Sequence, residues 1–163
     1  MRGLGRALLA LMVAAPVVAS AQDAVTFYGS PNSAISSGVV IPPNAAFLWT
    51  SGTTPSVADA TAKPGSRARF GDTRTQAASI LRNIQGQLEA RGLTMKDVVY
   101  LRAYLVPDPA NNNRIDMTGW SAAYGEVFGT ATNPTKPARS TVGVSALVNA
   151  DWLIEIEAFA VFP

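Results

Sequence analysis

The sequence contains neither cysteine nor histidine. Their absence excludes disulfides, Ser-His-Asp and Cys-His catalysis, haem ligation by histidine, and zinc sites built on these side chains. The glycine-rich phosphate motifs GxGxxG and GxxxxGK are also missing. Any chemistry must therefore come from carboxylates, arginine, lysine, tyrosine, hydroxyl side chains, backbone groups and bound water.

The first 21 residues are typical of a cleavable secretory signal peptide. Arg2 and Arg6 form a positive start, residues 7–18 are apolar and uncharged, and residues 19–21 match a small-x-small cleavage pattern. The apolar run is shorter than the roughly 20 residues that span a bilayer. We expect cleavage after Ala21, export to the periplasm or the medium, and no membrane attachment of the remaining domain, residues 22–163.

The remaining domain has no net charge. The full chain has 13 Lys+Arg and 11 Asp+Glu, and the signal segment holds two of the former and none of the latter, which leaves 11 of each. The basic pI of about 9.2 therefore belongs largely to the signal segment. A neutral domain has no long-range field to attract phosphate backbones, so we expect no nucleic-acid binding.

Hydrophobic periodicity predicts an α+β domain in the order β-β-β-α-β-α-β-β, with two helices covering one face of a mixed sheet. The other face would keep exposed Trp, Tyr and Val side chains, which predicts cover by a partner subunit. The expected strands are residues 24–29, 37–41, 46–51, 97–106, 139–148 and 152–162, the last two joined by a tight connection at 149–151. The expected helices are residues 72–91 and 116–128, and residues 53–71 are expected to form a loop.

Both helices have recognisable sequence signals. Thr73 and Gln76 match a capping box at the start of the first helix. Its apolar stripe, at helical spacing, consists of Ala77, Ile80, Leu81, Ile84 and Leu88. In the second helix Met117, Trp120, Tyr124 and Phe128 are expected on one buried side.

An arginine and two glutamates are the candidates for chemistry. Arg139 follows a proline at the start of a strand, and Glu155 and Glu157 interrupt an apolar strand. Carboxylates on a buried face are costly without partners, so they could lie at the sheet rim or pair structurally with Arg102 or Arg139. A hairpin turn at residues 149–151 would instead bring Arg139 and Glu155 to one sheet edge. That arrangement would suit an anionic ligand and a positioned water.

The same residues belong to an ordered set that resembles the RidA/YjgF family of reactive-intermediate deaminases over residues 35–161. The matching segments are Thr50-Ser51-Gly52, Gln76 with Asn83-Ile84, Gly92 with Asp97-Val98-Val99, Tyr124 with Phe128, Pro137-Ala138-Arg139-Ser140, and Ile154-Glu155-Ile156-Glu157-Ala158.

This resemblance implies a chorismate-mutase-like fold and a homotrimer with a central barrel and ligand sites between subunits. It implies hydrolysis of enamines and imines, such as 2-aminoacrylate, to a 2-keto acid and ammonia without metal or organic cofactor. Arg139 matches the arginine that holds the substrate carboxylate, and Glu155 matches the glutamate that positions water. Ser51 and Gly52 match the pair that lines the pocket.

Three positions and one loop depart from the family pattern. Gly38 stands where many members have a pocket tyrosine, Ser121 where asparagine is common, and Thr141 where cysteine is frequent. Ser121 and Thr141 remain expected substrate-binding positions, and the loop at residues 53–71 is longer than usual. The alternative to a deaminase is a non-catalytic trimer that binds small carboxylates or a protein partner. Ribonuclease activity is the least expected, given the neutral charge and the absence of histidine.

Overall fold

The computed structural model describes residues 24–163, so the predicted signal segment lies outside the described part of the chain. The strands are β1 Thr26–Tyr28, β2 Gly38–Val40, β3 Phe47–Trp49, β4 Val98–Leu105, β5 Ala138–Gly143 and β6 Ile154–Val161. The α-helices are α1 Thr73–Glu89 and α2 Met117–Gly125, and single 3-10 turns lie at Arg67–Arg69, Met95–Asp97 and Pro109–Asn111. Within residues 24–163, no helix is both long enough and apolar enough to cross a bilayer.

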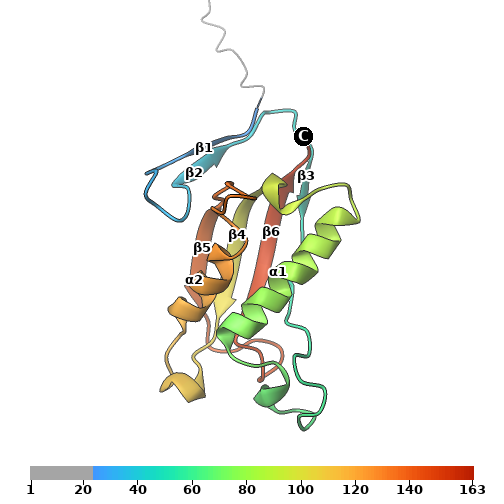
Figure 1. Ribbon diagram of the computed structural model, residues 1–163, viewed down its shortest axis with the longest axis vertical. Helices are drawn as coiled ribbons and strands as arrows, with labels where there is room; N and C mark the ends of the chain where they lie inside the picture. The colour runs from blue at the N-terminus through green and yellow to red at the C-terminus, as the bar shows by residue number, and fades with distance from the viewer. Residues whose placement is uncertain (1–23) are drawn as a thin grey trace, which may run out of the picture.

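The main sheet has four strands in the order β3-β6-β4-β5. Strand β6 pairs antiparallel with both β3 and β4, and β5 pairs parallel with β4. Strands β1 and β2 form a separate antiparallel pair beyond one end of the main sheet (Figure 1). Both α-helices lie on the same face of the main sheet (Figure 1). The predicted α+β class and element order are therefore confirmed.

The predicted hairpin between the last two strands is wrong. Strand β4 lies between β5 and β6, so these two strands are not neighbours. Residues 144–153 instead connect β5 to β6 across the end of β4. Neighbouring strands are about 5 Å apart, so a segment of this length easily spans the two intervals. Alternation within a strand indicates which side chains share a face, but it contains no information about which strand lies alongside.

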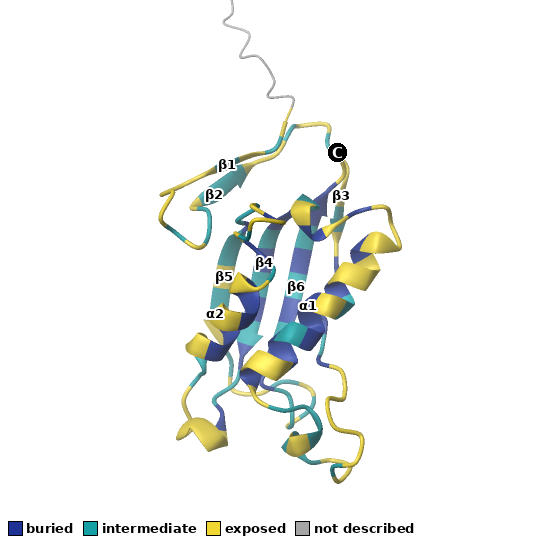
Figure 2. Ribbon diagram, viewed as in Figure 1, coloured by how far each residue is buried: buried dark blue, intermediate teal, exposed yellow. Residues whose placement is uncertain are grey.

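The core lies between the helices and the sheet. Figure 2 shows that the buried positions of α1 and α2 face the strands, while their exposed positions face solvent. The predicted stripe of α1 is buried throughout, and β4 and β6 contribute alternate side chains to the same cluster. In α2, Trp120 and Tyr124 are buried as predicted, as is Phe128 just beyond the helix, but Met117, the first residue of α2, is 44% exposed and the prediction that it is buried is wrong.

The predicted capping box of α1 is also wrong. Asp72 is the N-cap, and its carboxylate accepts a hydrogen bond from the amide of Thr75. This leaves the side chain of Gln76 free for another purpose. Its amide nitrogen donates to the carbonyls of Gly71 and Asp151, and its amide oxygen accepts from the amide of Leu153 at 2.7 Å. Fully buried Gln76 thus ties α1 to the connection that leads into β6.

We expect Gln76→Leu to lower the free energy of unfolding by about 3 kcal/mol, because a side chain of similar size leaves buried backbone groups without partners. Chemical denaturation measures this loss. Gln85→Leu is the matched control, since Gln85 is exposed on the same helix and bonds only to Glu89. Equal stability of the two variants would contradict the assigned role of Gln76.

The face of the sheet opposite the helices carries exposed apolar side chains in the single chain, as predicted, together with Arg102, Glu155 and Glu157. Phe47 and Trp49 on β3 are 61% and 55% exposed, and Val142 on β5 is 43% exposed. The ring of Phe159 lies 4.1 Å from that of Trp49 and 5.9 Å from that of Tyr100 by ring centroids. Exposed aromatic clusters of this kind mark interaction surfaces.

Candidate functional site

Arg139 projects toward the helices, not toward the open face. It stands in register with Leu101 of β4, which is fully buried beneath the helices, and residues in register share a face of the sheet. Its guanidinium lies 4.6 Å from the ring centre of Tyr124 and 5.2 Å from that of Trp120. Helix α2 therefore provides an aromatic platform on which this cation is stacked.

The guanidinium of Arg139 has no acidic partner. Its Nη1 atom is buried without a hydrogen-bond partner, and Arg139 takes part in none of the ion pairs found among the described residues. Burial lowers the pKa of Arg139, while arginine still keeps its charge at neutral pH. A buried, charged donor that lacks an acceptor is costly, and a bound anion would remove that cost.

A cleft of about 330 Å³ opens beside this guanidinium. Its walls come from the loop between β1 and β2, from α2 and from the segment that leads into β5. The residues that line it are Asn32, Ser33, Ala34, Ser121, Tyr124, Gly125, Phe128, Gly129, Lys136 and Arg139. The cleft is large enough for a small organic acid, and the Arg139 side chain in its wall is the group that a carboxylate would meet there.

Hydrogen bonds hold the loop wall of this cleft in place. The Lys136 ammonium donates to the carbonyls of Pro31 and Ser33 at 2.9 and 3.0 Å. The Tyr124 hydroxyl donates to the carbonyl of Ala34 at 3.2 Å, and burial raises the pKa of Tyr124 to about 12. At neutral pH this phenol therefore stays protonated and keeps donating.

The two predicted binding positions near Arg139 behave differently. Ser121 lines the cleft directly. The Thr141 hydroxyl accepts a hydrogen bond from the Trp120 indole at 3.2 Å, so it fixes the ring beneath Arg139. Thr141 thus contributes to the site through Trp120.

Glu155 lies on the other face of the sheet. It stands in register with Tyr104 of β4, whose neighbours Ala103 and Leu105 are buried under the helices. The predicted convergence of Arg139 and Glu155 at one sheet edge is therefore wrong within a single chain. It depended on the hairpin that the strand order rules out.

Gly52 and Glu155, two of the predicted site residues, lie next to each other on the open face of the sheet. Thr50 bonds to Ala158 and Thr53 to Ile156, so Ser51 and Gly52 together stand opposite one residue of β6, as in a β-bulge. The Glu155 carboxylate occupies the space where a side chain at Gly52 would begin. Only glycine permits this close approach.

Glu155 and Glu157 are not equivalent. The Glu157 carboxylate lies 3.6 Å from the Arg102 guanidinium and accepts from the Tyr104 hydroxyl at 3.3 Å, which matches the structural alternative raised from the sequence. Glu155 takes part in no ion pair with a described residue. Burial, and secondarily the charge of Glu157, raises the pKa of Glu155 above its ordinary value. A raised pKa brings a carboxylate closer to the range useful for proton transfer.

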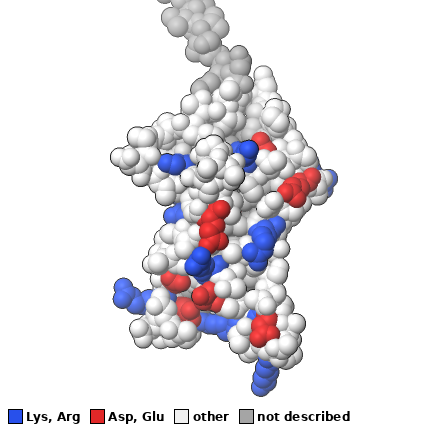
Figure 3. All heavy atoms as spheres, viewed as in Figure 1, with Lys and Arg blue, Asp and Glu red and all other residues white. Residues whose placement is uncertain are grey.

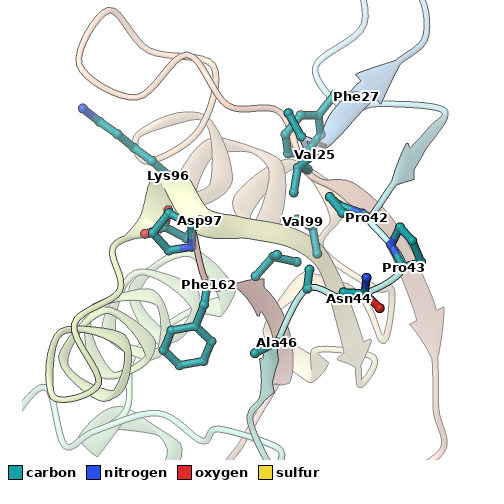
Figure 4. Close-up of a pocket in the computed structure, with 14 residues that line it drawn as sticks. Val25, Phe27, Pro42, Pro43, Asn44, Ala46, Lys96, Asp97, Val99 and Phe162 are labelled. Carbon is teal, nitrogen blue, oxygen red and sulfur yellow. The ribbon is translucent and has the colours of Figure 1, made fainter. Parts of the chain in front are cut away.

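A larger cavity, of about 690 Å³, lies elsewhere, between β1, the turn at Pro42 and Pro43, and the C-terminal residues. Figure 4 shows it surrounded mainly by apolar side chains, with the Lys96 side chain extending away from it. The Asp97 carboxylate already accepts from the amide and hydroxyl of Thr94. Without converging free polar groups, this cavity lacks the features of a ligand site.

Several residues of the Arg139 cleft were not found from the sequence. Trp120 and Tyr124 were expected only as core residues, although they also support the arginine. Lys136 and the loop at residues 32–34 carried no site prediction. Lys136 lies three positions before Arg139, and this proximity was the available signal. No cluster of acidic side chains able to hold a metal ion occurs in residues 24–163.

Comparisons with known proteins identify the family to which this fold belongs. The family described as endoribonuclease L-PSP matches residues 32–162. A RutC family protein of Pyrococcus horikoshii is 39% identical over 90 residues, which cover 55% of this chain and 63% of that protein. The Rid-family protein YyfB of Yersinia pestis is 26% identical with a TM-score of 0.62 over 85% of this chain and 98% of that one.

Two Escherichia coli structures are also similar. The YjgF gene product is 34% identical, with a TM-score of 0.55 over 72% of this chain and 81% of its own. TdcF with bound serine is 25% identical, with a TM-score of 0.56 over 80% of this chain and 96% of its own. The matched region contains both Arg139 and Glu155, and the chain belongs to the RidA/YjgF family, with its chorismate-mutase-like fold.

Proposed function

We propose that this protein is a hydrolase that deaminates enamines and imines of small amino acids to 2-keto acids and ammonia. The observation that carries the proposal is the buried Arg139 Nη1 atom, which has no partner and lies beside a cleft. Such a donor fits the carboxylate that every 2-imino acid carries. TdcF, a structural relative, has been solved with bound serine, which also carries a carboxylate.

Glu155 would activate the water. Water adds to the carbon of the protonated imine as Glu155 accepts its proton, which gives a carbinolamine. Glu155 returns this proton to the amino nitrogen, and the C–N bond then breaks as the hydroxyl proton passes to Glu155, which releases ammonia and leaves the keto group. An imine carbon is already electrophilic, so no nucleophilic cysteine or histidine is needed. The main contributions are position and proton acceptance.

Both groups can act on one substrate only if two copies of the chain meet. Arg139 lies on β5 and Gly52 follows β3, and these are the two edge strands of the sheet. The uncovered aromatic face supports burial against other copies. We propose a homotrimer in which the Arg139 cleft of one subunit faces Ser51, Gly52 and Glu155 of the next.

The signal segment supports export of this enzyme to the periplasm or the medium. Its substrates would then be imines that form outside the cytoplasm, for example from an exported oxidase or lyase. Arg139 would select those that carry a carboxylate.

A carboxylate-binding module without catalysis is the second candidate. It is favoured by one observation, namely that the Arg139 cleft is formed within a single chain and needs no contribution from Glu155. Ribonuclease activity, which the family description includes, has less support here. The face in Figure 3 shows basic and acidic side chains intermingled, with no continuous basic stripe for a phosphate backbone.

Ammonia release tests the proposal. An amino-acid oxidase generates 2-iminopropanoate from alanine in the presence of catalase, and we expect the purified protein to accelerate ammonia release well above the spontaneous rate. Sedimentation equilibrium should give three times the monomer mass. Binding of 2-oxobutanoate without any acceleration would instead support the binding module.

A further inference from the structure

The cleft beside Arg139 contains a second cation and no acid. Lys136 and Arg139 both line it, and none of the other described residues in its wall is charged. The nearest acidic residue along α2, Glu126, is exposed and paired with Arg74. A cleft with two cations and no carboxylate favours a ligand with two negative charges.

The Lys136 ammonium retains capacity for a ligand. A lysine ammonium has three N–H donors, and the carbonyls of Pro31 and Ser33 use two of them. Lys136 takes part in no ion pair with a described carboxylate. One donor and the full positive charge are therefore available beside the cleft.

The spacing of the two cations suits a short diacid. Lys136 and Arg139 are three residues apart on an extended segment, so their Cα atoms are within about 10 Å. Both residues line the same cleft. The Lys136 ammonium is held in place by the carbonyls of Pro31 and Ser33 in the loop wall.

We propose that the site prefers dicarboxylic 2-imino and 2-keto acids, with Arg139 binding the carboxylate next to the reacting carbon and Lys136 the distal one. This inference rests on the proposed function for the reaction, and it adds the substrate class. Lys136 is then a specificity-determining residue.

Calorimetry on the mature protein, residues 22–163, tests this preference by measuring the binding of two matched keto acids. The ligands 2-oxoglutarate and 2-oxopentanoate have chains of the same length and differ in the distal carboxylate. We expect 2-oxoglutarate to bind about 10-fold more tightly, as a charge-assisted hydrogen bond would provide. Lys136→Met should bring the two affinities within about 2-fold of each other.

A purely structural role of Lys136 in holding the loop would give a different result, with both affinities falling together and their ratio preserved. Ser36→Ala is the control for a loosened loop, because it removes only the Ser36 hydroxyl bond to the Lys136 carbonyl. It should leave the ratio unchanged. Equal binding of the two acids by the unmodified protein, or a preserved ratio in Lys136→Met, would overturn the inference while leaving the deaminase proposal intact. Binding of neither acid would contradict both.

Discussion

Arg139→Met is expected to lower kcat/KM for imine hydrolysis by about 1000-fold, since removing one partner of a buried charge pair costs 2–5 kcal/mol of ligand binding. Methionine fills much of the same volume over Trp120 and Tyr124 but cannot bind a carboxylate. The folded chain should be at least as stable as the parent, because the guanidinium is buried without an acid. Steady-state kinetics and thermal unfolding measure the two effects.

Arg91→Ala is the control for Arg139, because Arg91 is exposed just beyond the end of α1 and lies far along the chain from the cleft residues. It should leave both activity and stability unchanged. Near-parent turnover by a folded Arg139→Met protein would refute the role of Arg139 as carboxylate anchor. A large loss of stability would show that the arginine is primarily structural.

Glu155→Gln is expected to reduce kcat by about 100-fold or more, because the amide cannot accept the proton of the attacking water. Affinity for 2-oxobutanoate should stay close to that of the parent, since Arg139 supplies the binding. Calorimetry and single-turnover kinetics separate the two steps. Unchanged kcat in Glu155→Gln would exclude this residue as the base.

The pH profile gives a second measure of Glu155. Burial raises the pKa of its carboxyl above the ordinary value of a glutamate, with a further contribution from Glu157, and only the ionised form can accept a proton. Activity should therefore fall, as pH decreases, at a pH above that expected for an ordinary glutamate. Glu157→Gln should move this limb toward lower pH. For stability the sign is opposite, because a raised folded-state pKa favours the native state at low pH and loses that contribution as pH rises through it.

Gly52→Ala tests the same carboxylate without altering it. A Cβ at this position would collide with Glu155, so the carboxylate must move, and a displacement of about 1 Å can cost about 100-fold in rate. Gly86→Ala is the control, since a Cβ there meets nothing within 4 Å. It should leave activity unchanged.

The prediction of local structure from sequence succeeded where neighbours along the chain supply the information. The apolar stripe from Ala77 to Leu88 identified α1, and the strand predicted at residues 97–106 matches β4, Val98–Leu105. Both patterns record which side chains face the core, a property of each element by itself. Gln76 was misread because its partners, Asp151 and Leu153, are distant in sequence.

By itself the sequence determined the element order, the α+β class, the uncovered apolar face and the choice of Arg139 and Glu155 as unusual residues. Only the tertiary structure decided where those two residues lie. Arg139 lies on the helix-covered face of the edge strand β5, Glu155 lies on the open face of β6, and β4 separates the two strands. Strand order depends on contacts between segments far apart in sequence, and alternation is the same whichever strand lies alongside.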